Sequence, residues 1–164
     1  MRTLPLSRGL VALVDDDDYV RASVFKWSVI RAAGPRPYVF RIFRRDGRRE
    51  NVYLHRWLLD APTNLQVDHI NGNTLDCTRG NLRLATCSQN HMNRRSKVRR
   101  KHSPYKGVYF RADLRTRPWY AQIGFEGRTQ PLGTFATAED AARAYNKAAV
   151  TLFGSYARLN VVPL

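Results

Sequence analysis

V-D-H-I-N-G-N-T-L-D-C-T-R-G-N-L-R-L-A-T-C-S-Q-N-H-M-N occupies residues 67–93 and decides how the rest of the chain is interpreted. It sets an acid beside an imidazole, at Asp68 and His69, and then places asparagines at Asn81 and Asn90 with the spacing D-H-x11-N-x8-N. The hydrophobic pattern around these residues predicts a short strand, a long polar loop, a second short strand and the start of a helix.

These residue types suit metal-assisted hydrolysis of a phosphodiester. A carboxylate and an amide oxygen are hard ligands for a hydrated divalent ion such as Mg²⁺, and a neutral histidine can take a proton from an attacking water. The ion would stabilise the charge that develops on the phosphate. D-H-I-N-G-N is also good turn chemistry, and that alternative stays open. Asn81 and Asn90, each beside a predicted element, favour a site.

The local geometry gives each motif residue an expected place. Adjacent strand residues point to opposite faces, so we expect the acid–histidine pair where the strand gives way to the loop that begins at Ile70. Asn81 can donate and accept at once and is expected to brace this loop. Ser88 is the expected N-cap of the helix, which puts Asn90 in its first turn and lets Arg94 reach a phosphate.

The segment from Tyr53 to Arg95 carries H-R-W-L-L, V-D-H-I-N-G-N, R-G-N-L-R-L-A-T and Q-N-H-M-N-R. It resembles the HNH homing-endonuclease family, in the variant with asparagine at the third signature position. The resemblance implies that His69 is the general base, that Asp68 and Asn90 bind one divalent ion (Mg²⁺ or Mn²⁺), and that Asn81 braces the loop. It also implies DNA cleavage that leaves a 5′-phosphate and a 3′-hydroxyl.

Composition points to a polyanionic partner. The chain has 164 residues, a net charge of +15 and a pI near 10.7, and its 43% hydrophobic content argues against wholesale disorder. Nucleic acid is the leading candidate, and the family resemblance implies that it is double-stranded DNA. An anionic membrane is the competitor, but we find no apolar run long enough to span a bilayer. We expect a monomer with no membrane partner and no small-molecule cofactor.

The two cysteines, Cys77 and Cys87, are too few for a disulfide framework. They favour a reducing cytoplasm. A zinc site made with His69 and His91 is the alternative, but the spacing of the cysteines is wider than in usual zinc knuckles.

A basic block separates two predicted domains. Residues 94–101 hold six basic and no acidic side chains, which predicts a linker over 94–103 that contacts phosphates. Residues 1–93 are then an HNH nuclease domain with an N-terminal β-rich extension, and residues 104–164 form a second domain. The linker residues expected to contact DNA are Arg94, Arg95, Lys97, Arg99, Arg100 and Lys101.

The amino-terminal region predicts strands, a helix and a hairpin. Residues 3–14 read as strand, and the acids at 15–18 lead into a helix. The spacing of the apolar residues after these acids predicts that Tyr19, Val20, Val24, Phe25 and Trp27 are core.

An Asp46-Gly47 turn between alternating arms predicts a hairpin. The arginines at its tip are expected to contact phosphate: Arg44, Arg45, Arg48 and Arg49. His55 begins a short helix and is interpreted first as a core residue, with a role near the scissile phosphate as the alternative.

Residues 104–160 predict three strands and a helix that starts at a capping box on Thr137 and ends at Gly154. An alanine-rich stripe would cover one sheet face. The other face and its rim are expected to read a DNA groove, through Lys106, Tyr109, Arg111, Arg115, Arg117, Tyr120, Gln122 and Arg128.

Y-K-G-V-Y-F, W-Y-A-Q-I, L-G-T-F-A-T-A-E-D-A-A-R-A-Y-N-K-A-A and L-F-G-S-Y-A-R-L-N resemble the plant Apetala-two/ethylene-response-factor DNA-binding domain. Several sheet-face residues depart from the plant pattern, so its target sequence is not carried over. The expected fold is α+β: a ββα-metal nuclease domain plus a three-stranded antiparallel sheet packed on one helix. The pairing of domains resembles phage and bacterial endonucleases, which implies the cytoplasm of a bacterial or phage-infected cell.

The sequence therefore predicts a metal-dependent DNA endonuclease whose C-terminal domain directs binding. The alternative is a DNA-binding regulator that does not cut, and a third, weaker alternative is an RNA-binding protein.

Overall fold

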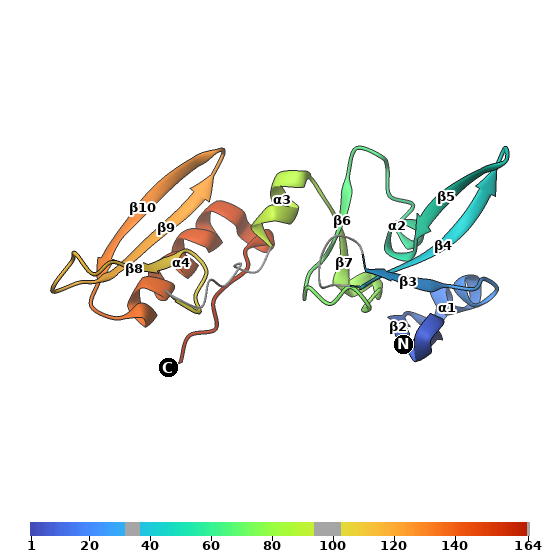
Figure 1. Cartoon of the computed structure of the whole chain (residues 1–164), viewed down its shortest axis with the longest axis horizontal. Coiled ribbons are helices and arrows are strands. Elements are labelled where there is room, and N and C mark those ends of the chain that lie inside the picture. Colours follow the sequence, from blue (N-terminus) through green and yellow to red (C-terminus); the bar gives the residue numbers. More distant parts are fainter. Residues whose placement is uncertain (32–36, 94–102, 164) are drawn as a thin grey trace. The chain divides into compact units, whose positions relative to one another are not determined.

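The computed structural model describes residues 1–31, 37–93 and 103–163 (Figure 1). The chain forms two compact units, Met1–Asn90 and His91–Leu164, with the division inside helix α3 (Cys87–Met92). The predicted DNA contacts of the basic block lie outside the described residues: Arg94, Arg95, Lys97, Arg99, Arg100 and Lys101.

The first unit is built from short antiparallel sheets and short helices. Three sheets are ordered β1-β2, β3-β4-β5 and β6-β7. In chain order the elements are β1 (Arg2–Pro5), a 3-10 turn (Ser7–Gly9), β2 (Val11–Val14), α1 (Asp16–Ser23), β3 (Ser28–Arg31), β4 (Pro37–Arg45), β5 (Arg48–Tyr53), α2 (Leu54–Leu58), β6 (Gln66–His69), a 3-10 turn (Arg79–Asn81), β7 (Leu82–Ala85) and α3.

The core of this unit differs from the prediction around α1. Trp27 is buried, but Val20 and Val24 are 64% and 74% exposed, so their assignment to the core is wrong. Phe25 is 37% exposed and its ring packs edge-on against Trp27 and Trp57. Helix α1 instead buries Asp18 and Ala22. Asp18 faces inward because its carboxylate binds the guanidinium of Arg79. The spacing of apolar residues gives no indication of such a partner.

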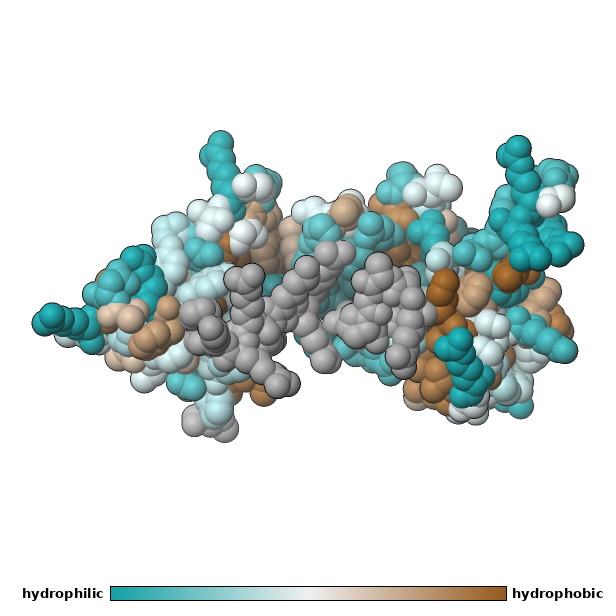
Figure 2. Space-filling model, viewed as in Figure 1, coloured by the Kyte–Doolittle hydropathy of each residue, from teal (hydrophilic) through white to brown (hydrophobic). Residues whose placement is uncertain are grey.

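The predicted hairpin is present and exposed. Asp46 and Gly47 have φ values of 49° and 75°, the left-handed backbone that the tight turn between β4 and β5 requires. Cross-strand register sets Arg44 opposite Arg49 and places Arg45 opposite the fourth arginine of the tip, Arg48. All four are exposed, and Figure 2 shows the end of this hairpin as a hydrophilic projection.

The second unit is a three-stranded antiparallel sheet covered by one helix, as predicted. The sheet order is β10-β9-β8. Small alanines on the helix pack against the sheet, and Tyr145 and Phe153 complete the core. The elements are β8 (Val108–Phe110), β9 (Trp119–Phe125), β10 (Arg128–Phe135), α4 (Ala138–Phe153) and a final 3-10 turn (Gly154–Tyr156).

The ends of α4 follow the sequence signals. Thr137 Oγ1 accepts a hydrogen bond from the Asp140 backbone N–H at 3.1 Å, which confirms the cap, and Gly154 is the C-cap with φ 51°. Mixed helices and small antiparallel sheets agree with the predicted α+β class. Within residues 1–31, 37–93 and 103–163, no helix is long and apolar enough to cross a membrane.

Candidate active site

The acid–histidine pair lies at the end of β6. The strand ends at His69 as predicted, but both residues are inside the regular ladder, where Asp68 pairs with Arg83 and His69 with Leu82. Their side chains therefore leave opposite faces of the hairpin. Both are 5% exposed.

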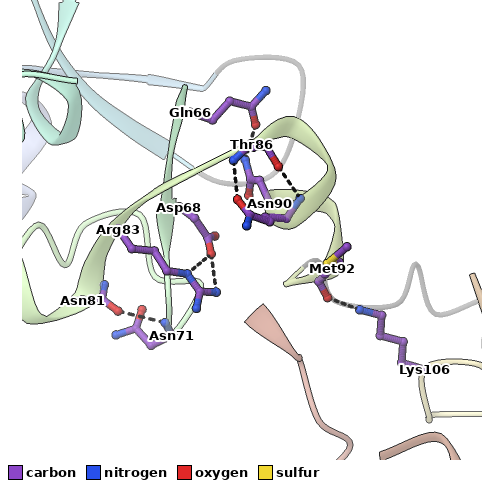
Figure 3. Close-up of polar contacts among 10 residues, drawn as sticks. Gln66, Asp68, Asn71, Asn81, Arg83, Thr86, Asn90, Met92 and Lys106 are labelled. Carbon is purple, nitrogen blue, oxygen red and sulfur yellow. Dashed lines mark hydrogen bonds and ion pairs between the residues drawn. The ribbon is translucent and has the colours of Figure 1, made fainter. Parts of the chain in front are cut away.

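The Asp68 carboxylate is held by the residue opposite it. Arg83 donates to Asp68 Oδ2 from Nε at 2.9 Å and from Nη2 at 2.7 Å (Figure 3). The two side chains are 15% and 6% exposed, so this is a buried ion pair, and removing one partner would leave an uncompensated charge. Sequence reasoning missed Arg83; its only signal was its place in the second strand of the motif.

Helix α3 begins earlier in the chain than predicted, at Cys87. The Thr86 N–H donates to Gln89 Oε1 at 2.8 Å, and the Gln89 N–H donates to Thr86 Oγ1 at 3.2 Å. This reciprocal pair is a capping box, so the assignment of the N-cap to Ser88 is wrong. The box T-x-x-Q was readable in the sequence, and a threonine with a glutamine three residues later satisfies two backbone donors where a lone serine satisfies one.

The cap positions Asn90 against the Asp68 side of the hairpin. Asn90 Nδ2 donates to Oε1 of Gln66 (Figure 3). Gln66 lies two residues before Asp68 in β6 and so shares its face. The candidate metal-ligating carboxylate and amide are thus brought to one side of the hairpin, and each has a partner from the chain itself.

The His69 imidazole is packed on the other side among rings and a thiol. Its ring centroid lies 5.1 Å from that of His55 and 6.5 Å from that of Tyr38, and its Nε2 is 4.0 Å from the Cys77 Sγ. Burial, and secondarily the charge of Asp76, raises the pKa of the Cys77 thiol to about 12. The thiol therefore stays protonated beside the imidazole.

His55 is a second buried imidazole in this cluster. It is 7% exposed, and burial, with smaller contributions from His69 and Arg56, lowers its pKa to about 3. Its Nδ1 atom has no hydrogen-bond partner among the described residues. His55 is thus the core residue that was expected first, and it also touches the candidate base.

Asn81 makes the bracing contacts expected of it. Its Oδ1 accepts from the Asn71 N–H at 2.9 Å, and its Nδ2 donates to the Asp76 carbonyl at 2.8 Å. The loop is also tied to β2, since the Leu13 N–H donates to the Leu75 carbonyl at 2.8 Å and the Cys77 N–H donates back to the Leu13 carbonyl at 2.9 Å. These bonds fix the loop that connects β6 to β7.

A salt bridge missed by sequence reasoning anchors the far end of the loop. Arg79 donates to both carboxylate oxygens of Asp18, at 2.8 and 2.9 Å, and to the Leu58 carbonyl at 3.0 Å. The Arg79 N–H also donates to Asp15 Oδ2 at 2.7 Å. The acidic run therefore orients the loop, a role that its sequence pattern alone did not indicate.

A cavity of about 250 Å³ opens beside this cluster. Gln66 and Val67, consecutive residues of β6, both line it. Its lining residues are Tyr38, Tyr53, His55, Arg56, Gln66, Val67 and Asn90.

Comparison with known proteins identifies the family. A family model described as HNH endonuclease matches residues 60–92. A protein of Acanthamoeba polyphaga mimivirus, named as an uncharacterised HNH endonuclease, is 30% identical over 161 residues, which cover 94% of this chain and 77% of the viral protein. This chain belongs to the HNH endonuclease family. No solved structure gives a significant match.

Membership of the HNH family indicates nuclease activity on DNA, and HNH nucleases generally use a divalent metal ion. Two of the four motif residues, Asp68 and Asn90, have polar contacts on the Asp68 side of the hairpin, and Asn81 braces the loop. In the described part of this HNH chain, no group of three or more His, Cys, Asp or Glu side chains could hold a metal ion.

Outside the HNH segment, the predicted sheet-face residues of the second unit lie at the surface to different degrees. Tyr109 is 44% exposed and pairs across the ladder with Tyr120, and Gln122 is half-buried. Arg111 is exposed but bonds to Asp113 at 2.7 Å. The remaining arginines of the predicted rim are exposed: Arg115, Arg117 and Arg128.

Lys106 differs from the other predicted rim residues. Its side chain is half-buried and its Nζ donates to the Met92 carbonyl (Figure 3). Burial, with a smaller contribution from Arg158, lowers its pKa to about 8. Its ammonium group is therefore occupied inside the second unit.

Proposed function

We propose that this chain is a metal-dependent DNA endonuclease in which residues 1–93 cut and residues 104–164 direct binding. The observation that carries the proposal is the placement of Asp68, His69, Asn81 and Asn90 on one β6–loop–β7–α3 segment inside the part matched by the HNH family. Asp68 and Asn90 are the proposed ligands of one Mg²⁺ or Mn²⁺ ion, and His69 is the proposed general base.

The chemistry of the donor set fits such an ion. A carboxylate and an amide oxygen are the hard donors that Mg²⁺ accepts, with water completing the shell. Asp68 is almost fully buried and so requires a positive charge beside it; the guanidinium of Arg83 supplies one at 2.7 Å. When bound, a divalent ion would stabilise the charge that develops on the phosphate and leaving oxygen.

The protein side chains have separate tasks in this proposal. His69 is the proposed acceptor of the proton of the attacking water. Its side chain leaves the face of the hairpin opposite Asp68 and packs among rings and a neutral thiol, so this step requires the imidazole to turn out of that packing toward the ion. Asn81 keeps the loop after His69 fixed through its two backbone bonds. Arg83 balances the Asp68 charge whenever no other cation does.

The basic surfaces are proposed to hold the DNA. The hairpin tip and the exposed sheet face of the second unit offer arginines and hydrogen-bonding side chains, and the sequence at 94–101 adds six basic residues. When weak binding segments are joined on one chain, the first contact with DNA raises the effective concentration of the other segments near the DNA. The overall affinity therefore exceeds that of each segment alone. Phosphate neutralisation by these residues would make binding weaken steeply with salt.

Nicking of supercoiled plasmid in Mg²⁺ tests the proposal. We expect the wild-type chain to convert supercoiled plasmid to open-circular or linear forms, and chelation of the ion to stop this. His69→Ala should reduce the rate by roughly 10³-fold while retention of plasmid in a gel shift stays within two-fold of wild type, on the order of experimental error. Cleavage by His69→Ala at the wild-type rate would refute the assignment of the base.

A second function, a DNA-binding regulator that does not cut, is favoured by one specific observation. Both proposed metal ligands already have partners in the chain, Arg83 for Asp68 and Gln66 for Asn90. If either Arg83 or a bound ion can neutralise Asp68, Arg83→Ala should be less stable than the wild-type chain but regain stability in millimolar Mg²⁺. An ion that binds only the folded state stabilises that state. Asp68→Ala/Arg83→Ala is the matched control and should show no recovery. No Mg²⁺ effect in Arg83→Ala, together with intact plasmid in the wild-type assay, would establish the regulator.

A further inference from the structure

We propose that the cavity beside His55 is a binding site for one unstacked nucleobase of the DNA strand. The inference rests on the proposed function in one respect, that the substrate is DNA. It adds a subsite that takes a base and not a phosphate, and that shares Asn90 with the proposed metal site.

The walls of the cavity are aromatic. The Tyr38 and Tyr53 rings meet edge-on, with centroids 6.4 Å apart and planes at 82°. His55 lies 5.7 Å from the first ring and 5.8 Å from the second. Rings around an open space offer π faces and edges to a flat partner, and aromatic side chains of this kind bind bases of any sequence by stacking.

Polar groups at the cavity match the edge of a base. The amides of Gln66 and Asn90, joined by one hydrogen bond, both line it, and each keeps further donor and acceptor capacity. His55 also lines the cavity and is 7% exposed. Its Nδ1 is itself buried, without a partner among the described residues, so the polar contacts to a base would come from the two amides.

Size and charge favour the same ligand. A volume of about 250 Å³ corresponds to several water molecules, which suits one flat heterocycle and is small for a larger ligand. No carboxylate is among the residues that line the cavity. The one charged lining residue, Arg56, donates to the backbone carbonyls of Ala61, Pro62 and Leu65 and so serves as structure, which leaves the rings and amides to contact the ligand.

A base can enter only after it leaves the helical stack. Bases in a duplex are covered on both faces. Enzymes that bind a single base in a pocket first extrude that base from the duplex, and the free-energy cost is smallest for unpaired or mismatched positions. The cavity therefore predicts a preference for DNA in which one base is already free. Because Asn90 lies both at the cavity and in the HNH motif, the extruded base would be close to the phosphate that is cut.

The test measures the base contribution separately from the phosphates. Fluorescence anisotropy of the full chain in EDTA would compare oligothymidylate of eight nucleotides, about one binding-site length, with an abasic oligomer of the same phosphate number. We expect the base-bearing strand to bind roughly ten-fold more tightly. Equal affinity of the two strands would overturn the inference, and plasmid nicking by the same protein shows whether the proposed function survives.

Variants assign this difference to the cavity. Tyr53→Leu should bring the two affinities together, and Tyr53→Phe keeps the ring and should preserve the difference. Phe110→Leu removes a ring of the second unit that is 44% exposed and is the matched control. Loss of the difference in Phe110→Leu with its retention in Tyr53→Leu would place the base outside the cavity and refute the inference.

Photo-crosslinking of the wild-type chain gives a result that does not depend on any variant folding. A thymidylate strand with a single 5-iodouracil, irradiated in complex with the protein, should form adducts that map to Tyr38, Tyr53 or His55. The absence of adducts at all three of these residues would refute the inference.

Discussion

The two units differ in what they bury. Of the eight buried polar or charged side chains in the described part of the chain, seven lie in the first unit and only Asn93 in the second. The second unit instead packs alanines and a few aromatic residues between α4 and its sheet. Burying polar groups costs stability unless each is paired. The first unit is therefore organised around paired polar groups, and the second around an apolar core.

The two units also depend on different contacts for their stability. The first unit depends on hydrogen-bond partners far apart in sequence, such as Arg79 with Asp18. The second depends on close approach of backbone and rings, as at Gly107, whose φ is +75°. The following predictions, from the largest expected effect on stability to the smallest, test this difference.

Gly107→Ala should unfold or strongly destabilise the second unit. A Cβ there would lie 2.1 Å from Cδ2 of Tyr145 and 2.6 Å from the Gln122 carbonyl oxygen, and overpacking of this kind costs about 3 kcal/mol. Urea unfolding monitored by tryptophan fluorescence and circular dichroism measures the loss. Gly80→Ala in the first unit is the control, because a Cβ there meets nothing within 4 Å. Equal stability of the two variants would contradict close packing in the second unit.

Asn81 and Asn160 form a matched pair of braces, one in each unit. Asn160 Oδ1 accepts from the Lys106 N–H at 2.6 Å and its Nδ2 donates to the Lys106 carbonyl at 3.1 Å, much as Asn81 bridges two backbone groups of its loop. Replacement of either by alanine leaves two backbone groups unpaired and should cost about 2 kcal/mol.

Only one of this pair should matter for cutting. Displacement of a reacting group by a loosened loop can cost roughly 100-fold in rate, so Asn81→Ala should slow plasmid nicking at saturating DNA, and Asn160→Ala should not. Measurements well below each variant's melting temperature exclude unfolding as the cause. A similar loss of nicking rate in both variants would remove the distinction between catalytic and binding units.

Stability of the first unit should fall as the pH falls below 6.5. Burial lowers the pKa of His55 from 6.5 to about 3, so below pH 6.5 the unfolded chain binds a proton that the folded chain excludes, and the stabilisation present above that pH is lost. Between pH 6.5 and 5.5 the expected loss is about 1 kcal/mol. Urea midpoints across this range measure it, and His55→Phe should flatten the dependence. An unchanged slope in that variant would show that another group is responsible.

The arginine hairpin should affect binding with little effect on folding. Arg44 and Arg49 face each other across the ladder, and like charges there are unfavourable, so their joint replacement by alanine should change stability by less than about 0.5 kcal/mol. The slope of log affinity for DNA against log salt should fall by roughly two. Arg111→Ala should change it less, because that guanidinium already bonds to Asp113 at 2.7 Å. The opposite ranking would make the second unit the main phosphate contact.

Features set by neighbours in sequence were predictable. The Asp46-Gly47 turn, the Thr137 cap and the Gly154 stop all depend on residues within a few positions of each other. The error at Ser88 is also local: Thr86 and Gln89 satisfied the stronger capping rule, which the prediction overlooked.

Features set by distant contacts were not predictable. The inward turn of Asp18 depends on Arg79, 61 residues away, and this contact, not the apolar spacing, selects the buried face of α1. Likewise Arg83 became the partner of Asp68 through the register of two strands separated by the loop.

The amino-acid sequence by itself determined the order of the elements, the four motif residues and the excess of positive charge, because spacing, turn residues and composition are properties of the chain that need no partner. The tertiary structure decided that the carboxylate faces an arginine and that the imidazole lies among rings and a thiol. Strand register and loop closure bring these groups together across long stretches of sequence, and local patterns do not encode that choice.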